Sequence, residues 1–436
     1  MIIAALASAP GKAGISVIRL SGNDTIKTVK EYLSIEEKLH EIVYNKLYLT
    51  DFLNEGEFID QVTVAFFKEG HSYTGEESAE IFCHGSPIIV RKILEALYLE
   101  KNIREAKPGE FTEKRFMNGK MDLVQAEAVI DLINSESDAA YISSTEQLKG
   151  GLSEELKKIN AMLIELMSIL ELELDFADED LDFTPNDEIT GKIDIAVEVI
   201  NKFIQGYQKG RIFRDGIKVA LVGDVNVGKS SLMNAFLKSD RVIVTDIAGT
   251  TRDVIEEKIE VNGYLLRIFD TAGIRETEDI IENEGISRSR RIIEEADIVL
   301  HVIDSTDPSE DEYAGNVIKV YNKTDLEDVI IDENSVKISC KTGSGIEELK
   351  HKIVKNVIDE ELTYRPYYIS NVRHLNILKE TVSQLEQAKM SIQQGQNNEV
   401  VIVDMRQALD TLGEITGETT SMDIINNIFG SFCIGK

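Results

Sequence analysis

The sequence predicts a multidomain α/β protein in which a doubly wound parallel sheet is inserted into a discontinuous helical domain. The chain has 436 residues, which is too long for one hydrophobic core. Short β-rich runs fill residues 1 to 118, and apolar residues then recur at helical spacing to about residue 210. From residue 216 onward, strands alternate with helical stretches, as in a sheet with helices on both faces.

The first 118 residues indicate a small α/β domain. β-rich runs occupy residues 14–22, 58–67 and 79–85, separated by Gly/Ser turns, and residues 86–100 have helical periodicity. The N-terminal stretch MIIAALASAPGK lacks a basic region before its apolar run, so we interpret it as a strand and not as a signal peptide.

Two helical blocks flank the alternating region. The first contains AMLIELMSILELEL and IDIAVEVINKFI, and the second lies beyond the TYRPYY segment. We expect the two blocks to pack together and Pro366 to lie in the return linker. The predicted domains are therefore 1–118, a helical domain of 119–215 plus 360–436, and a nucleotide domain of 216–359.

Composition restricts the class of protein. Of the residues, 42% are hydrophobic and 29% are charged, and no apolar stretch approaches the ~20 residues that cross a bilayer. Cys83, Cys340 and Cys433 are far apart and have no zinc-ligand spacing. We therefore expect a cytoplasmic protein with reduced thiols and no membrane insertion.

The net charge of −31 disfavours non-specific binding of nucleic acid, because the surface as a whole repels polyanions. A local basic patch, built across a dimer or supplied by a partner protein, would still hold a structured RNA.

A phosphate-binding loop follows the strand KVALVG. The run Gly223-Asp-Val-Asn-Val-Gly-Lys229-Ser230 matches the P-loop pattern and leads into a helical segment, SLMNAFL. Backbone N–H groups of such a loop surround the phosphates, Lys229 reaches the β and γ oxygens, and Ser230 ligates Mg²⁺. The predicted contacts of this loop are Asn226, Val227, Gly228, Lys229, Ser230 and Ser231.

Three further motifs predict a guanine nucleotide and a Ras-like P-loop GTPase domain. Asp270 ends a strand, where its carboxylate can hold a metal-bound water. Asp325 would accept from guanine N1–H and the N2 amino group, which adenine does not offer, so GTP is preferred over ATP. The motifs are Asp270-Thr271-Ala272-Gly273, Asn322-Lys323-Thr324-Asp325 and Ser339-Cys340-Lys341.

The residue after Gly273 is Ile274, where Ras-like GTPases have the glutamine that orients the attacking water. Hydrolysis therefore needs another water-positioning group and another positive charge. Thr251 would be a second Mg²⁺ ligand, and Asn226 is placed to offer its side-chain oxygen to a monovalent cation. The segment around Thr251 that is predicted to contact GTP comprises Thr245, Asp246, Ile247, Ala248, Gly249, Thr250 and Thr251.

Over essentially its full length, the chain resembles the bacterial MnmE (TrmE) family of tRNA-modification GTPases. The motifs that carry this resemblance are VIRLSG at 17–22, PGEFTEKRF at 108–116, NGKMDL at 118–123, TDIAGTTRD at 245–253 and FCIGK at 432–436. One departure is Val225, where the family often has proline, although Asn226 is retained.

The resemblance implies an N-terminal domain that binds a tetrahydrofolate derivative (5-formyl- or 5,10-methylene-tetrahydrofolate) and forms a homodimer. It also implies an FAD-containing partner protein, in a heterotetramer, with which the family installs an aminomethyl or carboxymethylaminomethyl group at C5 of the wobble uridine of certain tRNAs. Two GTPase domains of the family meet face to face and trap K⁺, which acts in place of an arginine finger.

Matched residue by residue, the resemblance assigns specific sites. Glu282 would be the carboxylate that positions water, beside Lys229 and Asp270 as the other catalytic residues, and Mg²⁺ would bind Ser230 and Thr251. Folate would contact Arg19, Glu80, Lys120 and Lys436, and K⁺ would contact Asn226, Thr245, Ile247 and Thr250.

Two alternatives stay open. Cys433 is either a nucleophile toward uridine C6 or a thiol that packs near the folate. The whole chain could instead be a non-enzymatic GTP switch in the assembly of ribosomes or other RNA–protein complexes. Such a switch has no use for a folate domain, so folate binding discriminates between the two functions.

Overall fold

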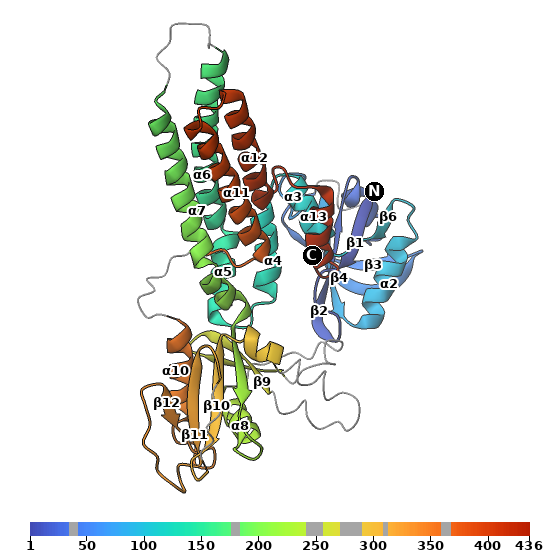
Figure 1. The fold of residues 1–436 in the computed structure, drawn as a ribbon. Coiled ribbons are helices and arrows are strands. Elements are labelled where there is room, and N and C mark those ends of the chain that lie inside the picture. The colour runs from blue at the N-terminus through green and yellow to red at the C-terminus, as the bar shows by residue number, and fades with distance from the viewer. Residues whose placement is uncertain (35–41, 176–183, 241–255, 271–289, 308–312, 359–367) are drawn as a thin grey trace, which may run out of the picture. The chain divides into compact units, whose positions relative to one another are not determined.

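The computed structural model describes residues 1–34, 42–175, 184–240, 256–270, 290–307, 313–358 and 368–436 (Figure 1). The chain forms two compact units. One unit combines residues 1–130 with residues 410–436, and the other contains residues 131–409. No helix in the described ranges is both long and apolar enough to span a bilayer.

The first unit contains a six-stranded sheet in the order β3-β4-β5-β2-β1-β6. Its strands pair antiparallel, except that β1 and β6 pair in parallel. The strands are β1 (Ile2–Leu6), β2 (Ala13–Ser21), β3 (Leu47–Asn54), β4 (Glu57–Phe67), β5 (Ser78–Gly85) and β6 (Ile103–Glu105). The sheet confirms the strands predicted at the N-terminus and at 14–22, 58–67 and 79–85.

Two helices, α1 (Thr25–Lys30) and α2 (Pro87–Tyr98), contribute to the core of this sheet. Ile26 and Val29 of α1 and Ile93 of α2 are buried together with Phe52 and Phe66 of the strands. Burial of such side chains contributes about 1.5–3 kcal/mol each, which makes this core the main source of the unit's stability.

The end of the chain folds onto this first unit. Helices α3 (Glu110–Met117), α4 (Leu123–Ile133) and α13 (Met422–Gly430) share a small core. Phe429 and Phe432 pack there against Leu123 and Ala126, and the Phe429 ring lies 5.5 Å from that of Phe432. The periodicity of the sequence did not predict α13 as a separate helix.

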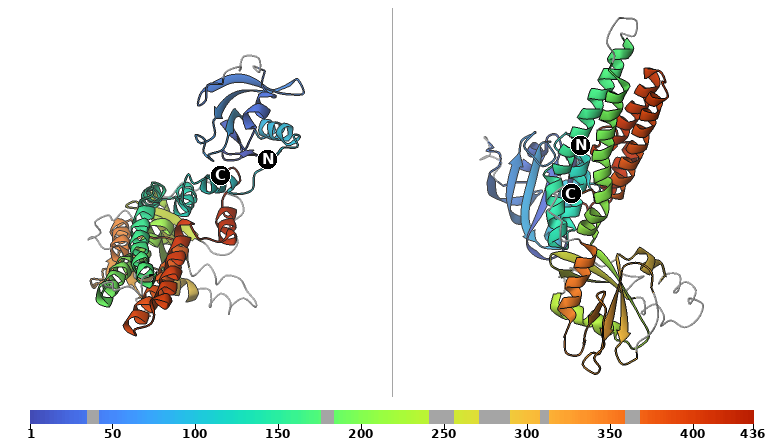
Figure 2. Two further views of the ribbon diagram at one scale, coloured as in Figure 1. Left: turned by 90° about the horizontal axis from the view of Figure 1, so that it is seen from above. Right: turned by 60° about the vertical axis from the view of Figure 1, so that its left-hand side comes forward.

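Long helices dominate one part of the second unit. They are α5 (Asp138–Leu148), α6 (Gly151–Asp175), α7 (Asn186–Asp215), α11 (Val372–Gln393) and the first residues of α12 (Asn398–Thr416). Helix α11 lies beside α7 (Figures 1 and 2), so the two helical blocks pack together as predicted. Gly210 of α7 permits the close approach of the segment that leads into α11, because a Cβ there would lie 2.2 Å from the carbonyl oxygen of Ile369.

A second six-stranded sheet, in the order β12-β11-β10-β7-β9-β8, forms the rest of this unit. Five strands run in parallel, and the edge strand β8 runs antiparallel to β9. The elements are β7 (Ile217–Val222), α8 (Lys229–Asp240), β8 (Glu256–Val261), β9 (Tyr264–Asp270), β10 (Ile298–Asp304), β11 (Val317–Asn322), β12 (Ser335–Lys337) and α10 (Ile346–Val357). The predicted doubly wound sheet is confirmed. The domain boundaries at 118, 215 and 359 stay predictions, and the linker at Pro366 lies outside the described residues.

Candidate functional site

The loop between β7 and α8 requires glycine at two positions. Gly223 has φ 137° and Gly228 has φ 103°, both in the left-handed region. A Cβ at Gly223 would lie 2.2 Å from the carbonyl oxygen of Val302, and one at Gly228 would lie 2.2 Å from Nδ2 of Asn322. The loop therefore presses against β10 and against the end of β11, and only a backbone without Cβ atoms fits.

Lys229 is the first residue of α8, and only 7% of it is exposed. Its Nζ donates to the carbonyl oxygens of Gly223, at 2.8 Å, and Asp224, at 2.6 Å, which holds the ammonium group against the loop. Ser230 and Ser231 are exposed in the first turn of the same helix. A helix N-terminus with a lysine and free hydroxyls suits a phosphate with its magnesium ion.

Asn322 joins this loop to the region where the base would bind. It is 3% exposed, and its Nδ2 donates to the carbonyl oxygen of Val227 at 2.9 Å. Its Oδ1 accepts from the backbone N–H of Cys340 at 3.2 Å. One side chain thus connects three motifs that are far apart in the sequence.

The Asp325 carboxylate lies between these motifs. Its Oδ1 accepts from the Ser339 hydroxyl at 2.7 Å, and its Oδ2 is 3.9 Å from Nζ of Lys341. Thr324 Oγ1 donates to the carbonyl oxygen of Ile338 at 2.9 Å, which fixes the preceding turn. The carboxylate is therefore oriented before any base arrives.

Lys323 belongs to the same motif as Asp325, and Cys340 follows Ser339. The ammonium group of Lys323 forms an ion pair with Asp304. Burial would raise the pKa of Asp304, but its hydrogen bonds to Lys323 and Thr306 outweigh burial and lower it. Burial raises the pKa of the Cys340 thiol to about 11, so this thiol is neutral and suits a purely structural loop position.

Several predicted residues lie outside the described ranges. They are Thr245, Asp246, Ile247, Ala248, Gly249, Thr250, Thr251, Thr271, Ala272, Gly273 and Glu282. Asp270, the last residue of β9, pairs in register with Leu221 of β7, so it ends at the same edge of the sheet as the phosphate loop. The roles of the outlying residues in binding GTP, Mg²⁺ and K⁺ and in positioning water stay predictions.

A second constellation lies in the first unit. Arg19 of β2 and Glu80 of β5 are direct cross-strand partners, and Arg19 Nε donates to Glu80 Oε1 at 2.9 Å. Their side chains are only 16% and 19% exposed. The Arg19 guanidinium lies 4.8 Å from the centre of the Tyr73 ring and 5.7 Å from that of Phe111. This pair is therefore enclosed by aromatic side chains.

The C-terminal tail brings Lys436 to the same place. Its carbonyl oxygen accepts from the backbone N–H of Phe111 at 3.1 Å. Burial lowers the pKa of Lys436, and the positive charge of Arg19 lowers it further. Gly435 allows this path, because its φ is 94° and a Cβ there would lie 2.0 Å from the carbonyl oxygen of Leu6.

The structure thus unites three of the four predicted folate residues, Arg19, Glu80 and Lys436. The fourth, Lys120, is exposed, and its side chain runs past Gly75, two residues from Tyr73. Cys433 is exposed, and its carbonyl oxygen accepts from Gly109 N–H at 3.4 Å. Sequence reasoning did not single out Tyr73, because nothing in its local pattern distinguishes it from a core aromatic, and it used Phe111 only as part of the PGEFTEKRF motif.

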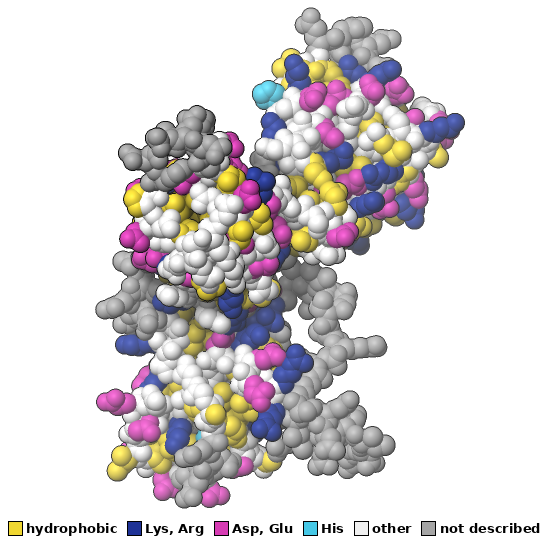
Figure 3. Space-filling view, turned by 45° about the horizontal axis from the view of Figure 1, so that its top comes forward, with side chains coloured by type: hydrophobic (Ala, Val, Ile, Leu, Met, Phe, Trp, Pro, Cys, Tyr) yellow, Lys and Arg dark blue, Asp and Glu magenta, His cyan; other side chains and the backbone are white. Residues whose placement is uncertain are grey.

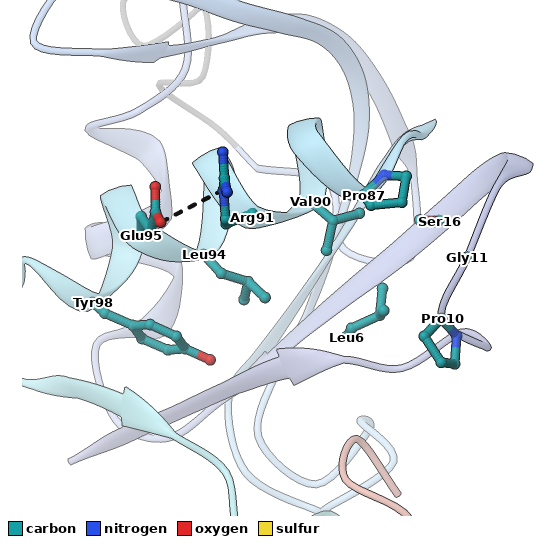
Figure 4. Close-up of a pocket in the computed structure, with 10 residues that line it drawn as sticks. All are labelled: Leu6, Pro10, Gly11, Ser16, Pro87, Val90, Arg91, Leu94, Glu95 and Tyr98. Atoms are coloured by element: carbon teal, nitrogen blue, oxygen red, sulfur yellow. Dashed lines mark ion pairs between the residues drawn. The ribbon is translucent and has the colours of Figure 1, made fainter. Parts of the chain in front are cut away.

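A surface pocket of about 350 Å³ lies elsewhere in this unit, against α2 (Figure 4). Its walls are mainly apolar, and Arg91 and Glu95 form an exposed ion pair of 3.7 Å at its side. None of the residues predicted to bind folate or nucleotide lines it. We assign this pocket no role.

Comparison with known protein families covers nearly the whole chain. The family model for the GTP-binding protein TrmE N-terminus matches residues 2–120, and that for the MnmE helical domain matches residues 123–433. The tRNA modification GTPase MnmE of Aquifex aeolicus is 39% identical over 100% of this chain and 99% of its own length. The protein of the same name from Porphyromonas gingivalis is 39% identical over 100% of this chain and 98% of its own length.

Among solved structures, the G domain of the T. maritima FeoB iron transporter aligns with 33% of this chain and 99% of its own length. The identity is 28% and the TM-score is 0.25, which is too low to carry a structural argument.

Proposed function

This chain belongs to the MnmE family of tRNA modification GTPases, and from that premise we propose that it binds and hydrolyses GTP in the service of tRNA modification. The observation that carries the proposal is the connected nucleotide site. Lys229 donates to the carbonyl oxygens of Gly223 and Asp224, and Asn322 donates to that of Val227, so both side chains are bonded to the phosphate loop. The Asp325 carboxylate accepts from the Ser339 hydroxyl and would accept from the two donors of guanine.

We further propose that Mg²⁺ binds Ser230 and Thr251 and that K⁺ binds Asn226, Thr245, Ile247 and Thr250. The support from the described residues is the exposed Ser230 hydroxyl and the position of Asn226, which is exposed with φ 67° in the phosphate loop. A fixed cation near the bridging oxygen stabilises charge that develops during phosphoryl transfer. Glu282 would orient the water, since Ile274 has no hydrogen-bonding group.

The cluster of Arg19, Glu80 and Lys436 supports a folate site. Its two cations and one carboxylate, next to aromatic rings, suit a ligand that has a planar heterocycle with polar edges and a negatively charged tail. We propose that a reduced folate, with 5-formyl-tetrahydrofolate or 5,10-methylene-tetrahydrofolate as the one-carbon carrier, binds there and that Lys120 joins it on binding.

An exposed apolar sheet face in the first unit supports the proposed homodimer. Leu49 of β3 is 67% exposed, Leu47 is 61% exposed and Ile15 of β2 is 65% exposed. Leu49 lies in register with Thr63, Phe82 and Val17 across four strands, and these three side chains are half-buried. Burying such a stripe against a second copy removes apolar area from water at about 25 cal/mol per Å².

The partner and the RNA substrate come from the family alone. We propose an FAD-containing partner in a heterotetramer with this chain, and the wobble uridine of certain tRNAs as the site of the aminomethyl or carboxymethylaminomethyl group. Figure 3 shows basic side chains among acidic ones on the face in view, so basic groups are present on this face despite the net charge of −31.

The test measures GTP hydrolysis in KCl and in NaCl at matched ionic strength, together with binding of 5-formyl-tetrahydrofolate. We expect faster turnover in KCl, loss of that difference in Asn226→Ala, and folate binding by both proteins. Equal turnover in the two salts contradicts the cation proposal. Potassium dependence without folate binding would favour a GTP switch in the assembly of ribosomes or other RNA–protein complexes.

A further inference from the structure

Tyr73 lies at the centre of the Arg19 cluster. The guanidinium carbon of Arg19 is 4.8 Å from the centre of the Tyr73 ring, and that of Arg115 is 5.0 Å from it. Arg115 also donates from Nη1 to the carbonyl oxygen of Tyr73 at 2.8 Å. The negative π system of the ring therefore attracts two guanidinium groups.

The loop that carries Tyr73 is held by buried hydroxyl groups. Thr74, which is fully buried, has its Oγ1 2.7 Å from Ser21 Oγ of β2. Gly75 N–H donates to Ser72 Oγ at 3.0 Å, and Asn118 Nδ2 donates to the Thr74 carbonyl oxygen at 2.8 Å. A side chain on so constrained a loop has a fixed direction in the free protein, which lowers the entropy lost when a ligand binds.

The second anchor of the ring is its hydroxyl group, which lies 3.1 Å from Oγ1 of Thr112 in α3. Phe111, the preceding residue, also contacts the Arg19 guanidinium and holds the Lys436 carbonyl oxygen. Helix α3 and the Tyr73 loop thus bound Arg19 with two aromatic rings, while Glu80 fixes its Nε.

We propose that Tyr73 is a positioning residue for the ligand-binding guanidinium of Arg19. Among the described residues the structure gives Arg19 Nη1 and Nη2 no protein acceptor, and Nε alone bonds to Glu80. Tyr73 and Glu80 orient these two nitrogens as a planar donor pair toward the acceptor edge of a reduced folate. This inference rests on the proposed folate function.

The experiment measures binding of 5-formyl-tetrahydrofolate to the full chain by isothermal titration calorimetry. Tyr73→Leu and Tyr73→Met both remove the π face, and the longer methionine retains more volume if the leucine variant folds poorly. Both variants should bind about tenfold more weakly. Tyr73→Phe retains the ring and loses only the hydroxyl group, so it should bind within about threefold of the unaltered chain.

A double-mutant cycle tests whether Tyr73 acts through Arg19. Arg19→Lys keeps the charge but loses the planar fork, so Tyr73→Leu should weaken binding by less than about threefold in that background. Tyr48→Leu is the matched control, because Tyr48 also has a cation over its ring, Lys46 at 5.5 Å, but lies on β3. It should leave binding unchanged.

The outcomes separate the two proposals. If the unaltered chain does not bind the folate, the proposed folate function fails. If it binds and both Tyr73→Leu and Tyr73→Met bind equally well, or if their losses persist in full in the Arg19→Lys background, the positioning role of Tyr73 is overturned. If Tyr73→Phe loses as much affinity as Tyr73→Leu, the hydroxyl contact to Thr112 is responsible and the π face is not.

Discussion

The side-chain amide of Asn322 donates a hydrogen bond to the carbonyl oxygen of Val227, which lies 95 residues earlier in the chain, at 2.9 Å. This bond connects the segment that we propose selects the base to the loop that would surround the phosphates. Because Asn322 also accepts from Cys340 N–H, its loss would leave a buried carbonyl oxygen and a partly buried N–H without their partner.

We therefore expect Asn322→Ala to weaken GDP binding by about tenfold or more and to lower the free energy of unfolding by about 1–3 kcal/mol. Titration with a fluorescent nucleotide and denaturant unfolding measure the two effects. Asn316→Ala is the control, because Asn316 Nδ2 bonds to the Asp297 carbonyl oxygen at 3.3 Å in an exposed position. A loss of affinity equal in both variants would contradict this account.

Asp325 is expected to set the choice of base. In Asp325→Asn the side chain offers an N–H group where guanine also has a donor, so GTP affinity should fall by about a hundredfold or more. Xanthine has a carbonyl oxygen in place of the 2-amino group, so the variant should gain affinity for xanthosine triphosphate. Competition between the two nucleotides measures the switch, and unchanged preference for GTP would exclude Asp325 as the base acceptor.

Docking of the C-terminal tail is expected to be necessary for folate binding. Gly435→Ala introduces a Cβ 2.0 Å from the Leu6 carbonyl oxygen at a φ of 94°, so the tail should detach and withdraw Lys436. Folate affinity should fall at least about tenfold, measured by calorimetry, while basal GTP hydrolysis stays unchanged. Gly430→Ala is the matched control, since a Cβ there has open space. If both variants bind folate with the original affinity, folate binding does not depend on docking of the tail.

The contributions of Glu110 and Glu113 in α3 to the free energy of unfolding should depend on pH in opposite ways. Burial would raise the pKa of Glu110, but hydrogen bonds from Arg104 and from the Lys107 N–H outweigh burial and lower it. A lowered pKa in the folded state contributes stability above the unfolded pKa of about 4.3, and that stability is lost as the pH falls through the folded pKa. Glu110→Gln should therefore cost about 1–2 kcal/mol at neutral pH and progressively less in acid.

Burial and the charge of Glu110 raise the pKa of Glu113, so its charged form is disfavoured in the folded state. Glu113→Gln should therefore be neutral or stabilising at neutral pH, and its advantage should disappear as the pH falls below the unfolded pKa. Urea unfolding of both variants across the acid range measures the contrast. If the free energies of unfolding of the two variants change with pH in the same way, the ion pair of Arg104 with Glu110 does not set the pH dependence.

Much of the fold follows from sequence pattern, but some elements do not. The central strands of the nucleotide sheet are continuous apolar runs with a motif at each end, so their order in the chain and their function could be predicted together. The edge strand β8 could not, because EEKIEV is mostly charged, although Ile259 and Val261 are buried in the core. Edge strands tolerate such charge, since one side faces no neighbour.

The residues of the candidate nucleotide site could be proposed from the sequence because they lie in short motifs with fixed spacing. The folate cluster could be proposed only from resemblance to a family, since residues 19, 80 and 436 share no motif. They meet because the register of β2 and β5 sets Arg19 opposite Glu80 and because Gly435 passes close to Leu6. Register and close backbone approach depend on the whole sheet, which local periodicity does not reveal.

The close approach of Gly435 to Leu6 also affects folding of the first unit during translation. Translation proceeds at ~5–20 residues per second, so the ribosome needs on the order of tens of seconds to reach residue 436 after it has made the first strand. Throughout that time the first unit lacks the segment that contacts Leu6 and Phe111 beside the Arg19 cluster. Deletion of residues 432–436 would therefore deprive the domain that is synthesised first of a segment that packs against it.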